Sequence, residues 1–149
     1  MTKSRSRFVN QDDDETELDQ EDMPCNHPCW THTSDDNDFS SALSYLSLCM
    51  SKKDAMNAVQ ALQKKQVNGK IEHYAPKDIL RAARLDALPA DNPEVERRIE
   101  MMNKGQKIGP PLIIRGDNGK AIIADGYHRT CAAYLDNMEA PIPCVVISD

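Results

Sequence analysis

The sequence predicts an α+β domain in which helices pack against a small mixed sheet. Apolar residues recur at helical spacing in several segments between residues 39 and 104. Two apolar runs then flank Asp117-Asn118-Gly119, and Asn-Gly between such runs indicates a β-hairpin because both residues tolerate a positive φ. One more helix and a last strand follow, and this order is typical of a domain built on a small sheet.

A pair of helices is expected at the start of the domain. Asp38 is a suitable N-cap for a helix over residues 39–50, and Ser51 is a suitable N-cap for a second helix over residues 52–66. Each helix has one apolar stripe, so we expect the pair, residues 38–67, to pack against another surface. The stripe of the first helix consists of Phe39, Leu43, Leu46 and Met50.

The core of the domain is expected over residues 70–149. Pro76 fits the first turn of a helix. Pro141 and Pro143 predict that the last strand lies at an edge of the sheet or enters it at that point. The expected elements are, in order, an extended stretch over 70–74, helices over 77–84 and 94–104, strands over 112–115 and 120–124, a helix over 127–135 and a strand over 142–147.

The charge is divided unevenly along the chain. Residues 1–38 hold 11 acidic and 3 basic residues, whereas residues 39–149 hold 13 acidic and 15 basic residues. Because residues 1–37 are acidic and poor in apolar side chains, we expect a disordered tail there that could bind a protein partner. The folded domain is expected over residues 38–149, and its nearly neutral charge argues against specific DNA binding.

The composition also bears on the cellular environment. No apolar run approaches the roughly 20 residues that cross a bilayer, and the N-terminus lacks the apolar segment of a secretory signal. An odd number of cysteines, five, without an export signal predicts a reduced, cytoplasmic protein. Zinc could be bound by Cys25, His27, Cys29 and His32, but a second ligand pair at a defined distance is absent, so a loose segment of the tail is the alternative.

The strongest functional signal is the turn at Gly126, where a predicted strand passes directly into a predicted helix. The first turn of a helix has unpaired N–H groups and the positive end of the dipole, which suits a phosphate group. Gly126 would permit the tight turn, His128 and Arg129 would donate hydrogen bonds, and Thr130 would add a hydroxyl. His128 could also act as an acid or base near neutral pH. The alternative is that Arg129 is a surface residue and His128 an ordinary histidine at a helix end.

Two further residues are candidates for a ligand contact. Asp91 and Asn92 lie in the loop before the helix over 94–104, and loops positioned by a scaffold often carry function. The alternative is a local structural role, because Asn92-Pro93-Glu94 has the pattern of a helix start, with a cap, a proline and an early acid.

Residues 109–147 resemble the ParB/sulfiredoxin superfamily, in particular its short bacterial ParB-like members. The resemblance is carried by Gly109-Pro110-Pro111 before an apolar strand, by Asp125-Gly126-Tyr127-His128-Arg129 with Ala132, and by Pro141 before the last strand. It extends upstream to Tyr74-Ala75-Pro76 and covers roughly the last 80 residues. The resemblance implies a nucleoside triphosphate, ATP or CTP, that binds with Mg²⁺ at the start of the helix, where Gly126, His128 and Arg129 would face the phosphates.

The chain departs from two activities of that superfamily. Tyr127 stands where sulfiredoxins carry their catalytic cysteine, so repair of sulfinic acid is not expected. The sequence given ends soon after the last strand, so the helix-turn-helix domain of partition proteins is not expected either. Three functions stay open: a nucleotide-dependent hydrolase or phosphotransferase, a non-enzymatic regulatory or interaction module, and a nuclease.

Overall fold

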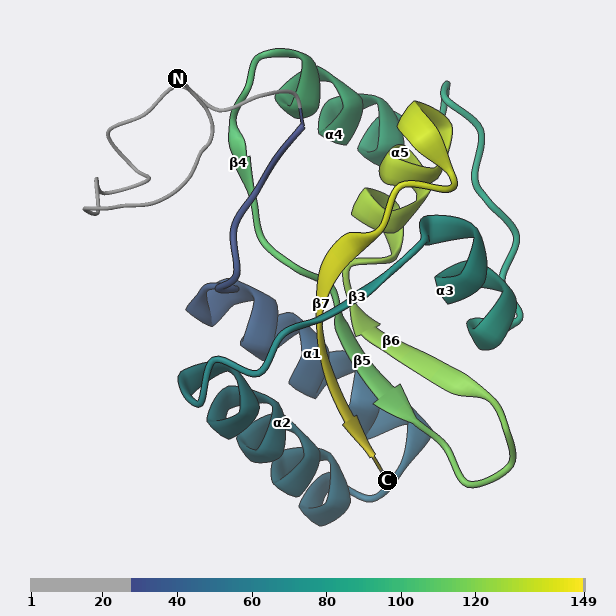
Figure 1. The fold of residues 1–149 in the computed structure, drawn as a ribbon. Helices are drawn as coiled ribbons and strands as arrows, with labels where there is room; N and C mark the ends of the chain where they lie inside the picture. Colours follow the sequence, from purple (N-terminus) through teal and green to yellow (C-terminus); the bar gives the residue numbers. More distant parts are fainter. Residues whose placement is uncertain (1–27, 149) are drawn as a thin grey trace, which may run out of the picture.

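The fold is built around a four-stranded mixed sheet with the strand order β3-β7-β5-β6 (Figure 1). The computed structural model describes residues 28–148. Strands β5 and β6 form the antiparallel hairpin, β7 runs parallel to β5, and β3 pairs with β7 in the antiparallel sense. The expected α+β class is therefore confirmed. The strands of this sheet are β3 (Glu72–Tyr74), β5 (Leu112–Arg115), β6 (Ala121–Asp125) and β7 (Ile142–Ser148).

Five helices in the described part of the chain cover the sheet. Their ends lie within three residues of the expected ones, and no helix among residues 28–148 is long and apolar enough to cross a membrane. Ser51 caps its helix as expected, since its hydroxyl accepts a hydrogen bond from the N–H of Asp54. The helices are α1 (Asp36–Cys49), α2 (Lys52–Val67), α3 (Pro76–Ala83), α4 (Pro93–Asn103) and α5 (Tyr127–Asn137).

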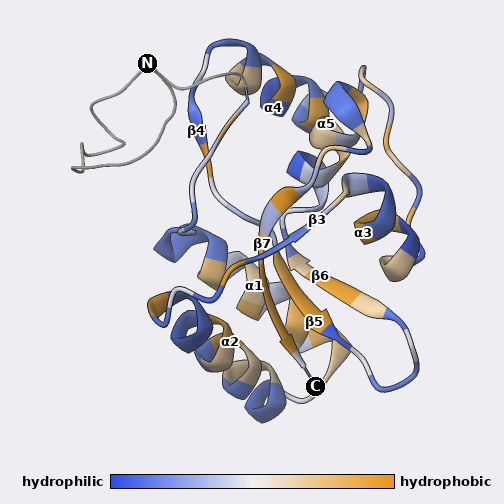
Figure 2. Cartoon of the chain, in the orientation of Figure 1, coloured by the Kyte–Doolittle hydropathy of each residue, from blue (hydrophilic) through white to orange (hydrophobic). Residues whose placement is uncertain are grey.

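The helices form two layers, one on each face of the sheet. Alternate residues of a strand point to opposite faces, and β5 follows this rule. Leu112 and Ile114 pack with α1 and α2 in one apolar cluster, whereas Ile113 packs with α3, α4 and α5 in the other. Figure 2 shows the central strands mainly in the hydrophobic colour and the outer faces of the helices in the hydrophilic colour. The helical pair, which was expected to pack against another surface, therefore packs against one face of the sheet.

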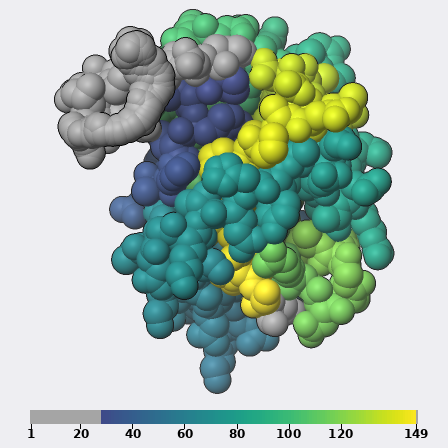
Figure 3. Space-filling view, viewed as in Figure 1, coloured from purple at the N-terminus to yellow at the C-terminus, as the bar shows by residue number. Residues whose placement is uncertain are grey.

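The segment before α1 is part of the fold. Strand β2 (Cys29–Trp30) pairs in parallel with β4 (Lys107–Ile108), and neither short strand was expected from the sequence. The buried Ser34 hydroxyl donates to the carbonyl of Pro110. The side-chain amide of Gln66 in α2 accepts the N–H of Ser34 and donates to the carbonyl of Ser34. In Figure 3 the first described residues lie against the body of the protein. The expected boundary after residue 37 therefore falls inside the ordered part, and residues 1–27 lie outside the described residues.

One local expectation was wrong, and of the two positions considered for the last strand, an edge or an entrance into the sheet, the edge is excluded. Helix α1 begins at Asp36 with Asp35 as its N-cap, and Asp38 is the third residue of the helix. Asp35 and Asp38 close a capping box in which each side chain accepts the backbone N–H of the other residue. The last strand is not at an edge of the sheet, because β7 lies between β3 and β5. Pro143 is tolerated because it precedes the residues of β7 that pair with β5.

We predict that the α1 layer depends on the burial of Leu46. Its side chain is fully buried, whereas Leu48 in the same helix is 88% exposed. Leu46→Ala should lower the free energy of unfolding by about 2–5 kcal/mol because it removes apolar contacts and leaves a cavity. Leu48→Ala, the matched control, should change it by about 0.5 kcal/mol or less. Urea denaturation measures both values, and equal losses would contradict the packing described.

Candidate functional site

The turn between β6 and α5 depends on a glycine. Gly126 has a φ of 105°, a left-handed conformation that side chains disfavour. A Cβ at this position would lie 2.9 Å from the Cα and Cβ of Pro111 and 2.8 Å from the Nε of Arg129. The missing side chain therefore makes room for Pro111 and Arg129.

The N-terminus of α5 has no side-chain cap. The first N–H groups of a helix have no partner within the helix, and the last two of these in α5 belong to His128 and Arg129. The next N–H, that of Thr130, donates to the carbonyl of Gly126 at 2.9 Å. The Thr130 side chain is fully buried, and its hydroxyl donates to the same carbonyl at 2.7 Å. Thr130 thus stabilises the turn from within, and its hydroxyl does not face a ligand as the sequence analysis expected.

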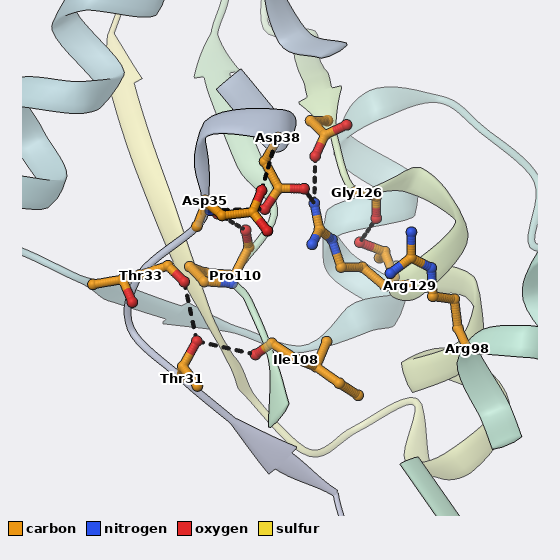
Figure 4. A network of polar contacts seen from close by, with 12 residues as sticks. Thr31, Thr33, Asp35, Asp38, Arg98, Ile108, Pro110, Gly126 and Arg129 are labelled. Carbon is orange, nitrogen blue, oxygen red and sulfur yellow. Dashed lines mark hydrogen bonds and ion pairs between the residues drawn. The ribbon is translucent and has the colours of Figure 1, made fainter. Parts of the chain in front are cut away.

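Arg129 lies beneath the turn and is only 4% exposed. Its Nη2 atom donates to Asp38 of α1 at 3.1 Å and, in a very short contact, to Asp125 at the end of β6 (Figure 4). The sequence analysis considered a phosphate contact or a surface position for Arg129, and the structure gives it two carboxylate partners in the interior. Its guanidinium therefore joins α1, β6 and α5.

The two carboxyl groups titrate in opposite directions. Burial opposes the ionisation of Asp38, but the charge of Arg129 and hydrogen bonds to its carboxylate outweigh burial and lower its pKa. Burial raises the pKa of Asp125 to about 7, and the neighbouring Asp38 adds to this effect while the charge of Arg129 opposes it. Two acids held this close share a proton. Below neutral pH the pair therefore carries about one negative charge opposite Arg129, and the second charge develops as the pH rises through about 7.

Arg98 of α4 is a second cation, next to Arg129. Its side chain is 24% exposed, and its nearest acid, Glu94, is 3.8 Å away and already holds Arg97 at 3.0 Å. Among residues 28–148, the Nε atoms of Arg98 and Arg129 are the buried side-chain polar atoms without a hydrogen-bond partner. Figure 4 shows the guanidinium of Arg98 next to Arg129. Burial and the charge of Arg129 lower the pKa of Arg98.

The other candidate residues lie around this centre. His128 is half-buried, and its ring centroid is 5.6 Å from that of Tyr127. Glu94 in the first turn of α4 is close enough to His128 for an electrostatic interaction. Asn92 caps α4 by accepting hydrogen bonds from the N–H groups of Glu94 and Val95, each at 3.1 Å, which is the structural alternative considered above. Asp91 is exposed in the turn before that cap.

The zinc prediction cannot be followed in full, because Cys25 and His27 lie outside the described residues. Cys29 is buried in β2, and the ring of His32 lies 6.0 Å from that of His73 in an edge-to-face arrangement. Within residues 28–148, no group of three or more His, Cys, Asp or Glu side chains is arranged to hold a metal ion. The acidic run between residues 12 and 22, expected to bind a protein partner, also lies outside the described residues.

Sequence reasoning missed three residues of this centre. Asp125 could have been found, because it lies four residues before Arg129, a spacing at which opposite charges pair. Asp38 was taken only as a helix cap, and its contact with Arg129 spans 91 positions of the chain. Arg98 was not among the predicted site residues, and its sequence neighbourhood gives no signal that its Nε is buried.

Comparisons with known proteins give no support from relatives: no family model, no curated protein and no solved structure matches the chain. The resemblance to the ParB/sulfiredoxin superfamily therefore stays a prediction from the motif and its flanks.

We predict that Gly126 tolerates no side chain. Gly126→Ala should lower the free energy of unfolding by at least about 2 kcal/mol, because the left-handed φ is strained for alanine and the methyl group meets Pro111. Gly119→Ala is the matched control. Its φ is 80° and nothing lies within 4 Å of the added atom, so strain alone should cost about 1 kcal/mol. Chemical denaturation compares them, and equal costs would show that the contact with Pro111 is unimportant.

We predict that Asp125 makes stability decrease as the pH rises towards 7. The folded protein retains the Asp125 proton up to about pH 7, whereas the unfolded chain loses it near pH 4, so the folded state binds more protons between these values. Relative to Asp125→Asn, the wild type should therefore lose at most about 1.4 kcal/mol per pH unit between pH 5 and 7.

Urea denaturation of both proteins at several pH values measures this difference. Titrating groups that do not interact with Asp125 cancel because both proteins contain them, and the pKa of Asp38, the acid coupled to Asp125, is lowered and so lies outside the range from pH 5 to 7. A difference that does not change with pH would contradict the raised pKa of Asp125.

Proposed function

We propose that the protein binds a nucleotide, or another ligand with a phosphate group, at the first turn of α5. The observation that carries the proposal is the uncapped N-terminus of α5 beside two arginines, Arg98 and Arg129, whose buried Nε atoms lack partners within the described residues. Unpaired N–H groups, the helix dipole and adjacent cations together favour a bound anion.

Two side chains are suited to contact the ligand directly. Arg98 retains some exposure and has only a long ion pair, so its planar guanidinium can donate to phosphate oxygens. His128 is half-buried in the first turn of α5 and can donate a further hydrogen bond. The backbone N–H groups of the same turn would complete the contacts. Arg129 acts through the turn as a positioning residue, because both carboxylates and its burial keep it in place.

The nucleotide class is supported by the resemblance of the motif to the ParB/sulfiredoxin superfamily. That resemblance also implies Mg²⁺ with a triphosphate, and Mg²⁺ is usually held by one or two carboxylates together with the phosphates. The carboxylates nearest the turn, Asp38 and Asp125, both pair with Arg129, so neither is free to coordinate a cation. These residues do not fit a resident Mg²⁺ ion, and the proposed function is therefore binding without a metal-dependent step.

We predict that Arg98 contributes directly to this binding. Arg98→Gln should weaken the affinity for the phosphate ligand about tenfold, because one charge-assisted hydrogen bond is lost. Arg97→Gln is the matched control, since Arg97 is a more exposed neighbour in the same helix that already pairs with Glu94. It should change the affinity by less than about threefold.

Isothermal titration calorimetry tests the proposal with ATP, CTP, GTP, their diphosphates and monophosphates, and inorganic phosphate. Each ligand is titrated into the wild type and both variants, with and without Mg²⁺. The absence of binding by the wild type to every one of these ligands would refute the proposed function. Equal affinities of Arg98→Gln and Arg97→Gln would instead place the ligand elsewhere.

A further inference from the structure

The positive charge of Arg129, beneath the turn, is already neutralised by two carboxyl groups of the protein. Asp38 and Asp125 contact the same nitrogen of Arg129, and the side chains of both acids are nearly as exposed as that of Arg98, at 19% and 18%. Both acids are thus partly exposed, and Asp125 immediately precedes the turn where the phosphate is proposed to bind. The candidate site therefore has fewer uncompensated positive charges than its arginines suggest.

We propose that Asp38 and Asp125 limit the charge of the ligand, so that the site binds one phosphate group and gains little affinity from the further groups of a polyphosphate without a metal ion. This inference rests on the proposed function and specifies its ligand class. A mononucleotide or a phosphomonoester would satisfy it.

The charges around the turn support this preference. Arg98 and Arg129 are positive, and Arg97 is a third cation, held by Glu94. Against them stand the carboxyl pair and Glu94, which lies nearest to Arg97 and within reach of Arg98 and His128. Asp35 is also near, through its backbone hydrogen bond to Asp38. When both acids of the pair are ionised, four acidic side chains accompany three arginines near the turn, so few positive charges remain for further phosphate groups.

Each additional phosphate would bring more negative charge towards the two acids. Coulomb repulsion between unit charges several ångströms apart near a protein surface is large enough to change an affinity about tenfold. Orthophosphate and a polyphosphate with the same terminal group would therefore bind with similar affinities. The added charges would lie near carboxylates, whereas a site for polyphosphate would place cations there.

The carboxyl pair of Asp38 and Asp125 also makes the preference for a single phosphate group depend on pH. At pH 6 the two acids share a proton, and replacing Asp38 by asparagine lets Asp125 ionise in its place, so the charge changes little. At pH 8.5 both acids are ionised in the wild type and only one is ionised in Asp38→Asn. The variant is therefore expected to differ from the wild type at the higher pH only.

The experiment measures the affinities of orthophosphate, pyrophosphate and tripolyphosphate by calorimetry, with a metal chelator present, at pH 6 and pH 8.5. In the wild type at pH 8.5, tripolyphosphate should bind no more than about threefold tighter than orthophosphate. Asp38→Asn should bind tripolyphosphate about tenfold tighter than the wild type at pH 8.5 and orthophosphate only about threefold tighter. At pH 6 both ratios should approach one.

Asp36→Asn is the matched control, because it removes the same charge from the exposed first turn of α1 without touching Arg129. It should leave all affinities within about twofold of the wild type. Much tighter binding of tripolyphosphate than of orthophosphate by the wild type would overturn the inference, and so would equal gains for both probes in Asp38→Asn. If the wild type binds none of the probes or nucleotides, the proposed function itself fails. Should Asp38→Asn not fold, the wild-type series alone still decides.

Discussion

The ion pairs of Arg129 with Asp38 and Asp125 are the interaction on which this structure depends most. They join the first turn of α1 to the end of β6 and the first turn of α5, which lie about ninety residues further along the sequence. Asp38 also accepts the N–H of Asp35, so one carboxylate closes the start of α1 and holds the arginine under α5. Removing one partner of such a buried group leaves a charge without compensation, which is costly.

Arg129 also constrains the backbone of the turn at Gly126. Gly126 is required because its Cα lies against Arg129 and Pro111, and Pro111 precedes β5, the strand that pairs with both β6 and β7. Pro110, next to it, accepts the hydroxyl of Ser34 from the segment before α1. A strand end, a helix start and an N-terminal segment thus meet at one buried cation, and the candidate site lies on the outer side of this junction.

The sequence was sufficient for most of the helices and strands. Periodicity predicts the helices because their apolar stripes face the sheet, and Asn118-Gly119 predicts the hairpin because Gly119 does adopt a positive φ. The two-residue strands β2 and β4 were missed because two residues show no period. Asp38 was assigned only to a cap and Arg98 was not predicted to belong to the site, since their interactions with distant elements depend on tertiary packing that no local pattern contains.

The electrostatics of α5 explain why acids lie so close to a proposed anion site. A helix N-terminus is positive, and α5 has no acidic residue in its first turn, while Arg129 lies in that turn and Arg98 lies beside it. Such a concentration of positive charge disfavours folding without a compensating anion. Asp38 and Asp125 provide that compensation from the side of the core, where the helix must pack in the absence of any ligand. The outward side of the turn retains its unpaired N–H groups and Arg98, so a ligand with one negative charge can add to the compensation there without displacing either acid.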